Sequence, residues 1–451
     1  MNSYTYMLCD PQPTDQELYQ SLSTCFEAID PLSSFEQQSS PEQIVNIIDH
    51  PCGSGKTNTL IAIINERIDL KFLIVVQTLD EVKRVLDQTT KGRLKSPEDP
   101  NYSQLTKGQQ LEDFVLSGAS VVITHALYER AGALAWHGAL RSYHVVIDEV
   151  PNAVFLGRRL SLKNFQEFYI DPGYCDMSAS GMVSATEKGI EQAERLKEVL
   201  HEKTMESIFS GRLFHDQKDH LIQTIPVYLF TEPLSVTVLT FMAEGTLFTR
   251  FLLKSEIPYR VLQDINATYV FKKNARRKLT LGTISALEKV RFAFSKQKEY
   301  GATSKEVTKV TVSLKNLKQR RLADVSLKDV IITCAKSNWY HTTSRKSDVT
   351  KAGPFAKNSR MFKDINWVPN TTRGTNDYAH CSHAIYLYEQ NANPVILSWL
   401  GANTKAFREA YALSEMVQWI WRTRVRRGES VHVYMPSGRM RGILKTWLNE
   451  P

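Results

Sequence analysis

The sequence predicts an α/β protein of two domains, each built on a parallel sheet, with a boundary near residues 250–265. Its 451 residues are enough for two or three domains, and a hydrophobic share of 42% can supply their cores. Short β-branched apolar runs alternate with helical stretches, first between residues 44 and 150 and again from about residue 307 onward. Such alternation is typical of parallel strands covered by helices on both faces.

We expect an acidic N-terminal extension at residues 1–40, a first domain at 41–255 with a helical insertion at about 155–225, and a second domain at 256–451. The extension contains one expected helix, around residues 16–29. In the first domain the expected strands are 44–48, 72–76, 120–124, 143–147, 227–230 and 236–240, and the expected helices are 59–64, 79–86, 126–134 and 186–201. In the second domain the expected strands are 307–312, 330–333, 384–387 and 431–435, with a helix at 414–424 and a loop at 337–370.

A glycine-rich turn follows the first strand and opens a helix, which is the context that a phosphate-binding loop requires. Gly53 and Gly55 let the backbone curl so that several N–H groups face one anion, and the helix adds its positive dipole end. Lys56 would reach the β- and γ-phosphates of a nucleotide, and the Thr57 hydroxyl would ligate magnesium. His50 stands where such loops usually have Gly or Ala. The candidate nucleotide-binding residues are Gly53, Ser54, Gly55, Lys56, Thr57 and Asn58.

A second strand, at residues 143–147, ends in the acid pair Asp148 and Glu149. Ligands of open α/β sheets sit at the carboxyl ends of the strands, so this pair and the phosphate loop should share one edge. Asp148 suits a magnesium shell, and Glu149 suits the polarisation of an attacking water. A carboxylate directly after the metal-binding Asp favours ATP hydrolysis over phosphoryl transfer to a metabolite.

The composition indicates the cellular compartment of the protein and the chemical class of its partner. The six cysteines are scattered without paired spacing, which indicates a reducing, intracellular (cytoplasmic) compartment. No apolar run reaches the ~18 residues of a membrane span, and the N-terminus lacks the apolar region of a signal peptide. Residues 271–370 contain 23 Lys or Arg against seven Asp or Glu, a net charge of +16. A basic block of this size favours a polyanionic partner, most often nucleic acid.

Several segments, taken in order, resemble the motif series of superfamily 2 helicases, the DEAD-like class built from two RecA-like domains. Leu73–Thr78 and Val122–His125 resemble two strand-end segments that contact the nucleic-acid backbone, so Thr78 and Thr124 are candidate contacts. Leu239–Gly245 occupies the place of the coupling motif and keeps Thr240, although it lacks the compact Ser-Ala-Thr pattern.

The resemblance continues in the second domain. Val330–Thr333 resembles the strand that opens nucleic-acid contact there, which makes Thr333 a candidate. Thr372–Asp377 resembles the R-G-x-D segment at the domain interface, with one extra residue before the Asp. The candidate residues of this segment are Arg373, Gly374 and Asp377.

The last motif, Q-x-x-G-R-x-x-R, has its counterpart at Gln418–Arg426, where Gln418 and Arg422 match and Trp421 replaces the Gly. The resemblance implies an arginine finger that completes an ATP site between the domains, and Arg422 or Arg424 is the candidate. The variant segments look most like bacteriophage DEAD-like helicases and herpesvirus-type origin-binding helicases. The acid box reads Asp-Glu-Val-Pro, which makes an RNA-restricted DEAD-box protein less favoured.

These observations predict a nucleic-acid-dependent ATPase that uses ATP and Mg²⁺ to move along, unwind or remodel DNA, single-stranded or forked. An RNA-remodelling ATPase remains an alternative, because backbone contacts discriminate mainly through the 2′-hydroxyl. A second alternative is a nucleic-acid-binding regulator whose ATP site only switches conformation, which His50 and the altered coupling motif leave open.

Overall fold

The computed structural model describes residues 13–26, 44–99, 104–342, 347–357, 359–372 and 374–450. The chain divides into two compact units. The first comprises Met1–Thr240 and Arg250–Ala267, and the second comprises Phe241–Thr249 and Thr268–Pro451. Among the described residues, none of the helices combines the length and the apolar character that a membrane span requires.

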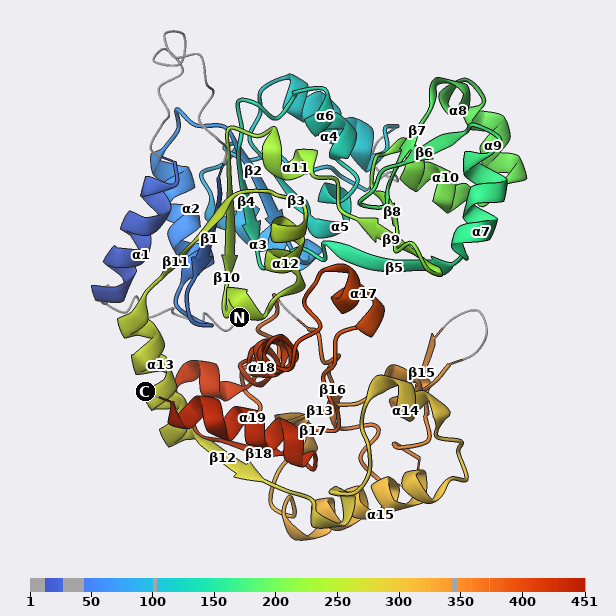
Figure 1. The fold of residues 1–451 in the computed structure, drawn as a ribbon. Coiled ribbons are helices and arrows are strands. Elements are labelled where there is room, and N and C mark those ends of the chain that lie inside the picture. The colour runs from blue at the N-terminus through green and yellow to red at the C-terminus, as the bar shows by residue number, and fades with distance from the viewer. Residues whose placement is uncertain are drawn as a thin grey trace. The chain divides into compact units, whose positions relative to one another are not determined.

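The first unit is built on a six-stranded parallel sheet with the strand order β11-β1-β10-β4-β2-β3 (Figure 1). The strands are β1 (Val45–Asp49), β2 (Phe72–Val76), β3 (Val121–Thr124), β4 (His144–Asp148), β10 (Ser235–Thr240) and β11 (Tyr259–Gln263). The helices are α1 (Pro13–Thr24), α2 (Lys56–Glu66), α3 (Leu79–Gln88), α4 (Lys107–Leu116), α5 (His125–Tyr128), α6 (Gly132–Trp136), α11 (Tyr228–Thr231) and α12 (Leu247–Lys254, which begins in the second unit). Every residue of β1 and β2 is buried, because helices cover both faces of a parallel sheet.

The expected helix of the N-terminal extension is confirmed as α1, which lies beside α2 (Figure 1). Leu18, Leu22 and Phe26 are fully buried in the same hydrophobic cluster as Leu60 and Ile64 of α2. Leu18 and Leu22 are four positions apart, which places them on one face of α1, and Phe26 lies just beyond the end of the helix. The segment before the phosphate loop therefore contributes to the core of the first unit.

The segment at 155–225 is not the helical insertion that we expect from its sequence. It forms a five-stranded antiparallel sheet, β5-β9-β8-β7-β6, together with short helices. The strands are β5 (Val154–Arg159), β6 (Cys175–Met177), β7 (Met182–Ala185), β8 (Leu213–His215) and β9 (His220–Thr224), and the helices are α7 (Leu162–Phe165), the π-helix η2 (Gln166–Ile170), α8 (Glu187–Glu191), α9 (Ala193–Val199) and α10 (Glu202–Phe209). Strands of three to six residues are too short to show a period of two, so the charged helices dominate the pattern.

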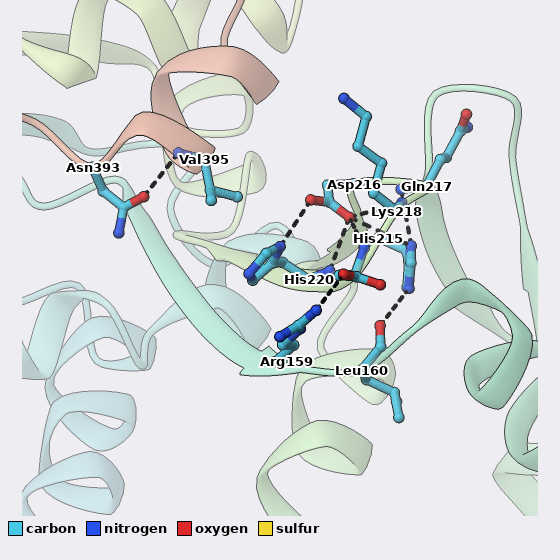
Figure 2. Close-up of polar contacts among 10 residues, drawn as sticks. Arg159, Leu160, His215, Asp216, Gln217, Lys218, His220, Asn393 and Val395 are labelled. Carbon is cyan, nitrogen blue, oxygen red and sulfur yellow. Dashed lines mark hydrogen bonds and ion pairs between the residues drawn. The ribbon is translucent and has the colours of Figure 1, made fainter.

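Asp216 organises the tight turn between β8 and β9 (Figure 2). Its Oδ1 accepts hydrogen bonds from the backbone N–H groups of Lys218, Asp219 and His220 at 2.9–3.0 Å. Burial acts to raise the pKa of Asp216, but these donors and the His220 ring outweigh it and lower the pKa. The turn is therefore held by a carboxylate that stays charged.

The second unit contains a five-stranded parallel sheet with the order β12-β18-β17-β13-β16. Its strands are β12 (Leu279–Gly282), β13 (Val330–Thr333), β16 (Asn366–Trp367), β17 (His383–Tyr386) and β18 (Val431–Tyr434), and β14 (Tyr340–Thr342) pairs with β15 (Ser347–Ala352) in a separate hairpin. Its helices are α13 (Ile265–Lys278, which begins in the first unit), α14 (Phe294–Glu299), α15 (Lys305–Arg320), α16 (Lys336–Trp339), α17 (Pro394–Trp399), α18 (Lys405–Ile420) and α19 (Gly438–Asn449). Short 3₁₀ turns lie at η3 (Ala243–Gly245), η4 (Ser285–Leu287), η5 (Leu327–Asp329) and η6 (Arg424–Arg427).

Three other expected elements are wrong. Residues 307–312 belong to helix α15, where Val307, Val310 and Leu314 form a buried helical stripe. Residues 228–230 lie in helix α11, whose Leu229 and Phe230 are buried, and Val227 is its N-cap. The expected loop at 337–370 contains α16, β14, β15 and β16. The predicted α/β fold class is nevertheless confirmed, since both units carry parallel sheets flanked by helices.

Candidate nucleotide-binding site

The loop between β1 and α2 has the backbone shape of an anion cradle. Gly53 and Gly55 adopt φ values of 86° and 83°, in the left-handed region that side chains disfavour. Gly55 is the N-cap of α2 and makes no side-chain cap, so the first N–H groups of this described helix are left for another acceptor. An anion at this position would gain those donors and the positive end of the helix dipole.

Lys56 is folded back onto the loop that precedes it. Its Nζ donates to the carbonyl oxygens of His50 and Pro51, at 2.7 and 3.1 Å. These bonds hold the ammonium charge beside the N-terminus of α2. The loop thus combines backbone donors and a fixed positive charge, as polyphosphate binding requires.

Thr57 and Asp148 join the phosphate loop to the acid pair. Thr57 Oγ1 donates to Asp148 Oδ2 at 2.7 Å, although the two residues are 91 positions apart. The contact forms because β10 alone separates β1 from β4, which brings the carboxyl ends of all three strands to one edge. Hydroxyl and carboxylate oxygens at this edge fit the ligand preference of Mg²⁺.

The electrostatics of Asp148 also fit a cation. Burial and then the adjacent Glu149 carboxylate raise the pKa of Asp148 to about 6, while Thr57 and Lys56 act in the opposite direction. A charged carboxylate is therefore costly here unless a positive ion lies beside it. The donor set and its charge are both appropriate for magnesium.

Glu149 has a backbone conformation that is uncommon for a residue with a side chain. Its φ is 70°, and its N–H donates to Leu239 O of β10 at 2.8 Å. Left-handed backbone at a non-glycine residue costs on the order of 1 kcal/mol or more and persists only when neighbours hold it. Such strain occurs frequently at functional sites.

Sequence reasoning missed two residues that reach this acid pair. His125 Nε2 lies 2.9 Å from the carbonyl oxygen of Asp148, and Gln77 Nε2 lies 3.3 Å from the same imidazole nitrogen. Both belong to the strand-end segments that the sequence links to nucleic acid, but only the threonines beside them were chosen as candidates. Their position could have identified them, because Gln77 directly follows β2 and His125 directly follows β3.

The candidate threonines fall into different environments. Thr78 caps α3 by accepting the N–H of Glu81 at 3.2 Å, and Thr124 ends β3 without a side-chain cap. Thr240 ends β10, where its carbonyl accepts the N–H of His50 at 3.0 Å. The Thr240 and Thr333 hydroxyls are buried and lack a hydrogen-bond partner within the described part of the chain.

Two other loop residues have clear local partners. Asn58 Oδ1 accepts from Arg84 Nη1 at 3.3 Å, and Arg84 forms an ion pair with Glu81 at 2.6 Å. His50 is buried, and burial followed by the charge of Lys56 lowers its pKa. A neutral imidazole therefore occupies the position where glycine or alanine is usual.

In the second unit, the last motif contacts two other predicted segments. Gln418 is buried on α18, and its Nε2 donates to Phe241 O at 3.3 Å, next to the coupling segment's 3₁₀ turn. Arg422 is also buried, and its Nη1 donates to Thr375 O at 3.2 Å. Three motif segments that are distant in sequence therefore meet within this unit.

The remaining candidates of the second unit lie nearby. Gly374 has a φ of 68°, and the N–H of Asp377 donates to Thr375 Oγ1 at 3.2 Å. Arg424 is partly exposed and donates through Nε to Ser430 O at 2.7 Å. Arg373 lies outside the described residues.

Comparisons with known proteins match two separate parts of the chain to two different family models. Residues 9–157 match the family model described as the type III restriction enzyme, res subunit, and residues 273–448 match the YonV C-terminal Rossmann-like domain. The SPbeta prophage-derived uncharacterized protein YonV of Bacillus subtilis (strain 168) is 23% identical over 419 residues, which cover 90% of this chain and 98% of that protein.

The solved structures to which this chain is similar are distant in sequence. S. tokodaii Xpd4 is 12% identical with a TM-score of 0.43, and the match covers 94% of this chain and 97% of that one. S. cerevisiae Dbp5 bound to RNA and ADP BeF3 is 11% identical with a TM-score of 0.34, covering 98% and 93%. The helicase MrfA bound to DNA is 12% identical with a TM-score of 0.35, covering 98% and 51%.

The match over residues 9–157 contains the whole phosphate loop and both acids of the pair. The resemblance of the chain to superfamily 2 helicases, which the motifs indicate, is thereby confirmed. The prophage source of the relative agrees with the likeness to bacteriophage proteins.

Proposed function

We propose that this protein is a nucleic-acid-dependent ATPase. Its first half carries a match to a helicase-type domain, and its second half matches a Rossmann-like domain. The protein would use Mg-ATP hydrolysis to translocate on, unwind or remodel DNA. The observation that supports this most is the 2.7 Å hydrogen bond between Thr57 and Asp148, because it unites a phosphate cradle with a metal-binding acid. Hydrolysis also needs a group that accepts a proton from water, and the carboxylate of Glu149, next to Asp148, can fill this role.

In this proposal the residues of the site bind phosphate, hold the metal and activate water. The backbone N–H groups of residues 53–58 and the Lys56 ammonium bind the β- and γ-phosphates. Thr57 and Asp148 hold magnesium, which when bound neutralises phosphate charge. Glu149 accepts a proton from water and orients it toward the γ-phosphate.

The basic region at 271–370 supports a polyanionic partner. On α15 the apolar stripe is buried, whereas Lys305, Lys309 and Arg320 are exposed. Exposed cations on a stable helix can contact phosphates without reading bases. We propose DNA as the polymer, and that Arg422 or Arg424 stabilises the charge that develops on the transferred phosphoryl group.

A second candidate, an ATP-switched regulator with little turnover, is favoured by one observation. His50 fills the loop position that glycine or alanine usually occupies, and it is 2% exposed. A side chain at this position can alter how closely the loop approaches phosphate.

One stimulation assay separates these functions. ATP turnover is measured without polymer, with single-stranded DNA, with forked DNA and with RNA, and Lys56→Ala serves as the inactive control. Stimulation by DNA supports the proposal, whereas stimulation by RNA alone transfers it to RNA. Turnover that is absent under every condition and unchanged in Lys56→Ala excludes the enzyme and leaves the regulator.

A further inference from the structure

The peptide bond between Asp148 and Glu149 is held at both of its polar ends. Its carbonyl oxygen lies 2.9 Å from His125 Nε2, and its N–H donates to Leu239 O at 2.8 Å. The two partners come from different sides of β4, since β10 lies next to β4 in the sheet and β3 lies beyond β2. The orientation of this one peptide plane therefore depends on residues of two other strand ends.

The orientation matters because it determines where the Glu149 side chain starts. Glu149 has a φ of 70°, a conformation that relaxes unless its flanking peptide is held. Rotation of that peptide would move the carboxylate relative to Thr57 and Asp148. Misplacement of a catalytic group by about 1 Å can reduce turnover by about 100-fold.

The position of His125 allows it to hold this peptide and to be affected by a ligand bound at the carboxyl ends of β2 and β3. It is the first residue of α5, directly after the end of β3, and it is 7% exposed. A carbonyl can only accept, so the imidazole nitrogen that faces Asp148 O carries the proton. The Gln77 amide nitrogen, just beyond β2, lies 3.3 Å from the same ring nitrogen, but it is itself a donor and makes no hydrogen bond to a nitrogen that carries the proton.

We propose that His125 is a positioning residue that makes ATP turnover depend on the occupant of the carboxyl ends of β2 and β3. This rests on the proposed function, in which DNA is the polymer, and on Thr78 and Thr124, the candidate DNA contacts beside the ends of these two strands. Binding beside Thr124 restrains the turn that carries His125, and the imidazole transmits that restraint to the Asp148–Glu149 peptide. His125 itself touches neither the nucleotide nor the polymer in this scheme.

The test compares two polar replacements that differ by one methylene group. In His125→Gln the amide nitrogen can reach roughly the position of the imidazole Nε2, whereas in His125→Asn it is too short to reach Asp148 O. His137→Ala removes an exposed histidine 12 positions later and is the matched control. For each protein, kcat and KM for ATP are measured with and without saturating single-stranded DNA, and DNA affinity is measured by fluorescence anisotropy.

We expect His125→Asn to lose about 10- to 100-fold of the DNA-stimulated kcat, with a stimulation ratio near one. Its KM for ATP and its DNA affinity should stay within about threefold of the wild type, because neither ligand contacts His125. His125→Gln should recover most of the stimulation, and His137→Ala should behave as the wild type.

The outcomes distinguish this inference from the proposed function. If the wild type is not stimulated by any polymer, the proposed function fails and the inference fails with it. If the wild type is stimulated and His125→Asn is stimulated equally, the inference alone is overturned. Equal losses in the Asn and Gln variants, accompanied by a lower melting temperature or weaker DNA binding, would show a structural role and overturn it as well.

Discussion

Replacing Asp148 with Asn should abolish ATP turnover and at the same time stabilise the metal-free protein at pH 8. In the folded protein, burial and the neighbouring Glu149 carboxylate raise the pKa of Asp148 to about 6, from an ordinary value of 3.8. The protonated form is therefore the favoured one in the fold. The stability that it contributes is complete below about pH 4 and is lost as the pH rises through 6.

The size of the effect follows from the two pKa values. Each pH unit between them corresponds to about 1.4 kcal/mol, so the charged carboxylate costs at most about 3 kcal/mol. Asp148 is half-buried, and partial screening by water reduces this to about 1–3 kcal/mol. Asn cannot ionise, yet its side-chain oxygen can still accept the hydrogen bond of Thr57.

The assay is urea unfolding in EDTA at pH 4.5, 6 and 8, with Asp87→Asn as a control at an exposed position of α3. The gain in free energy of unfolding should be smallest at pH 4.5, at about a third of its value at pH 8, and largest at pH 8. Magnesium should reduce the difference at pH 8, because it stabilises the wild-type carboxylate. A variant that is no more stable than the wild type at pH 8 would refute the view that burial and Glu149 raise the pKa of Asp148 and make its charged form unfavourable.

Three further predictions concern the second unit. Arg422→Ala and Arg424→Ala should each bind nucleotide normally while at least one loses most turnover, as measured by steady-state ATPase assays; normal turnover in both would place the transition-state arginine elsewhere. If the basic region at 271–370 binds phosphates, DNA affinity by anisotropy should fall by about 10³ between 50 and 200 mM salt, and a flat salt profile would contradict this. Trp419 is fully buried against Tyr386, so Trp419→Ala should lower the free energy of unfolding by about 3–5 kcal/mol in urea titrations, and a loss under 1 kcal/mol would be inconsistent with this packing.

The elements that sequence reasoning located best are the central parallel strands. β2 lies at Phe72–Val76 as expected, and β13 lies at Val330–Thr333 as expected, because strands buried on both faces are continuous apolar runs. The same rule misassigned residues 307–312, where valines occupy the buried face of α15. A short β-branched run fits either a buried strand or one face of a helix, and only the packing of the rest of the chain decides between them.

The short antiparallel strands at 154–225 could not be found by pattern. β6 and β8 have three residues each, so their pairing with neighbouring strands, and not their own composition, defines them. Strand formation there depends on contacts between residues far apart in sequence.

The amino-acid sequence by itself determined the chemistry of the phosphate loop and the acid pair. Glycines that tolerate a positive φ, a lysine at the helix start and adjacent carboxylates are local properties, and the rule that parallel strands end at one edge was enough to bring Thr57 to Asp148. The contact of His125 with the Asp148–Glu149 peptide was decided only by the tertiary structure. It depends on the order and register of β3, β2 and β4 in the sheet, and no spacing along the chain encodes the lateral distance between those strand ends.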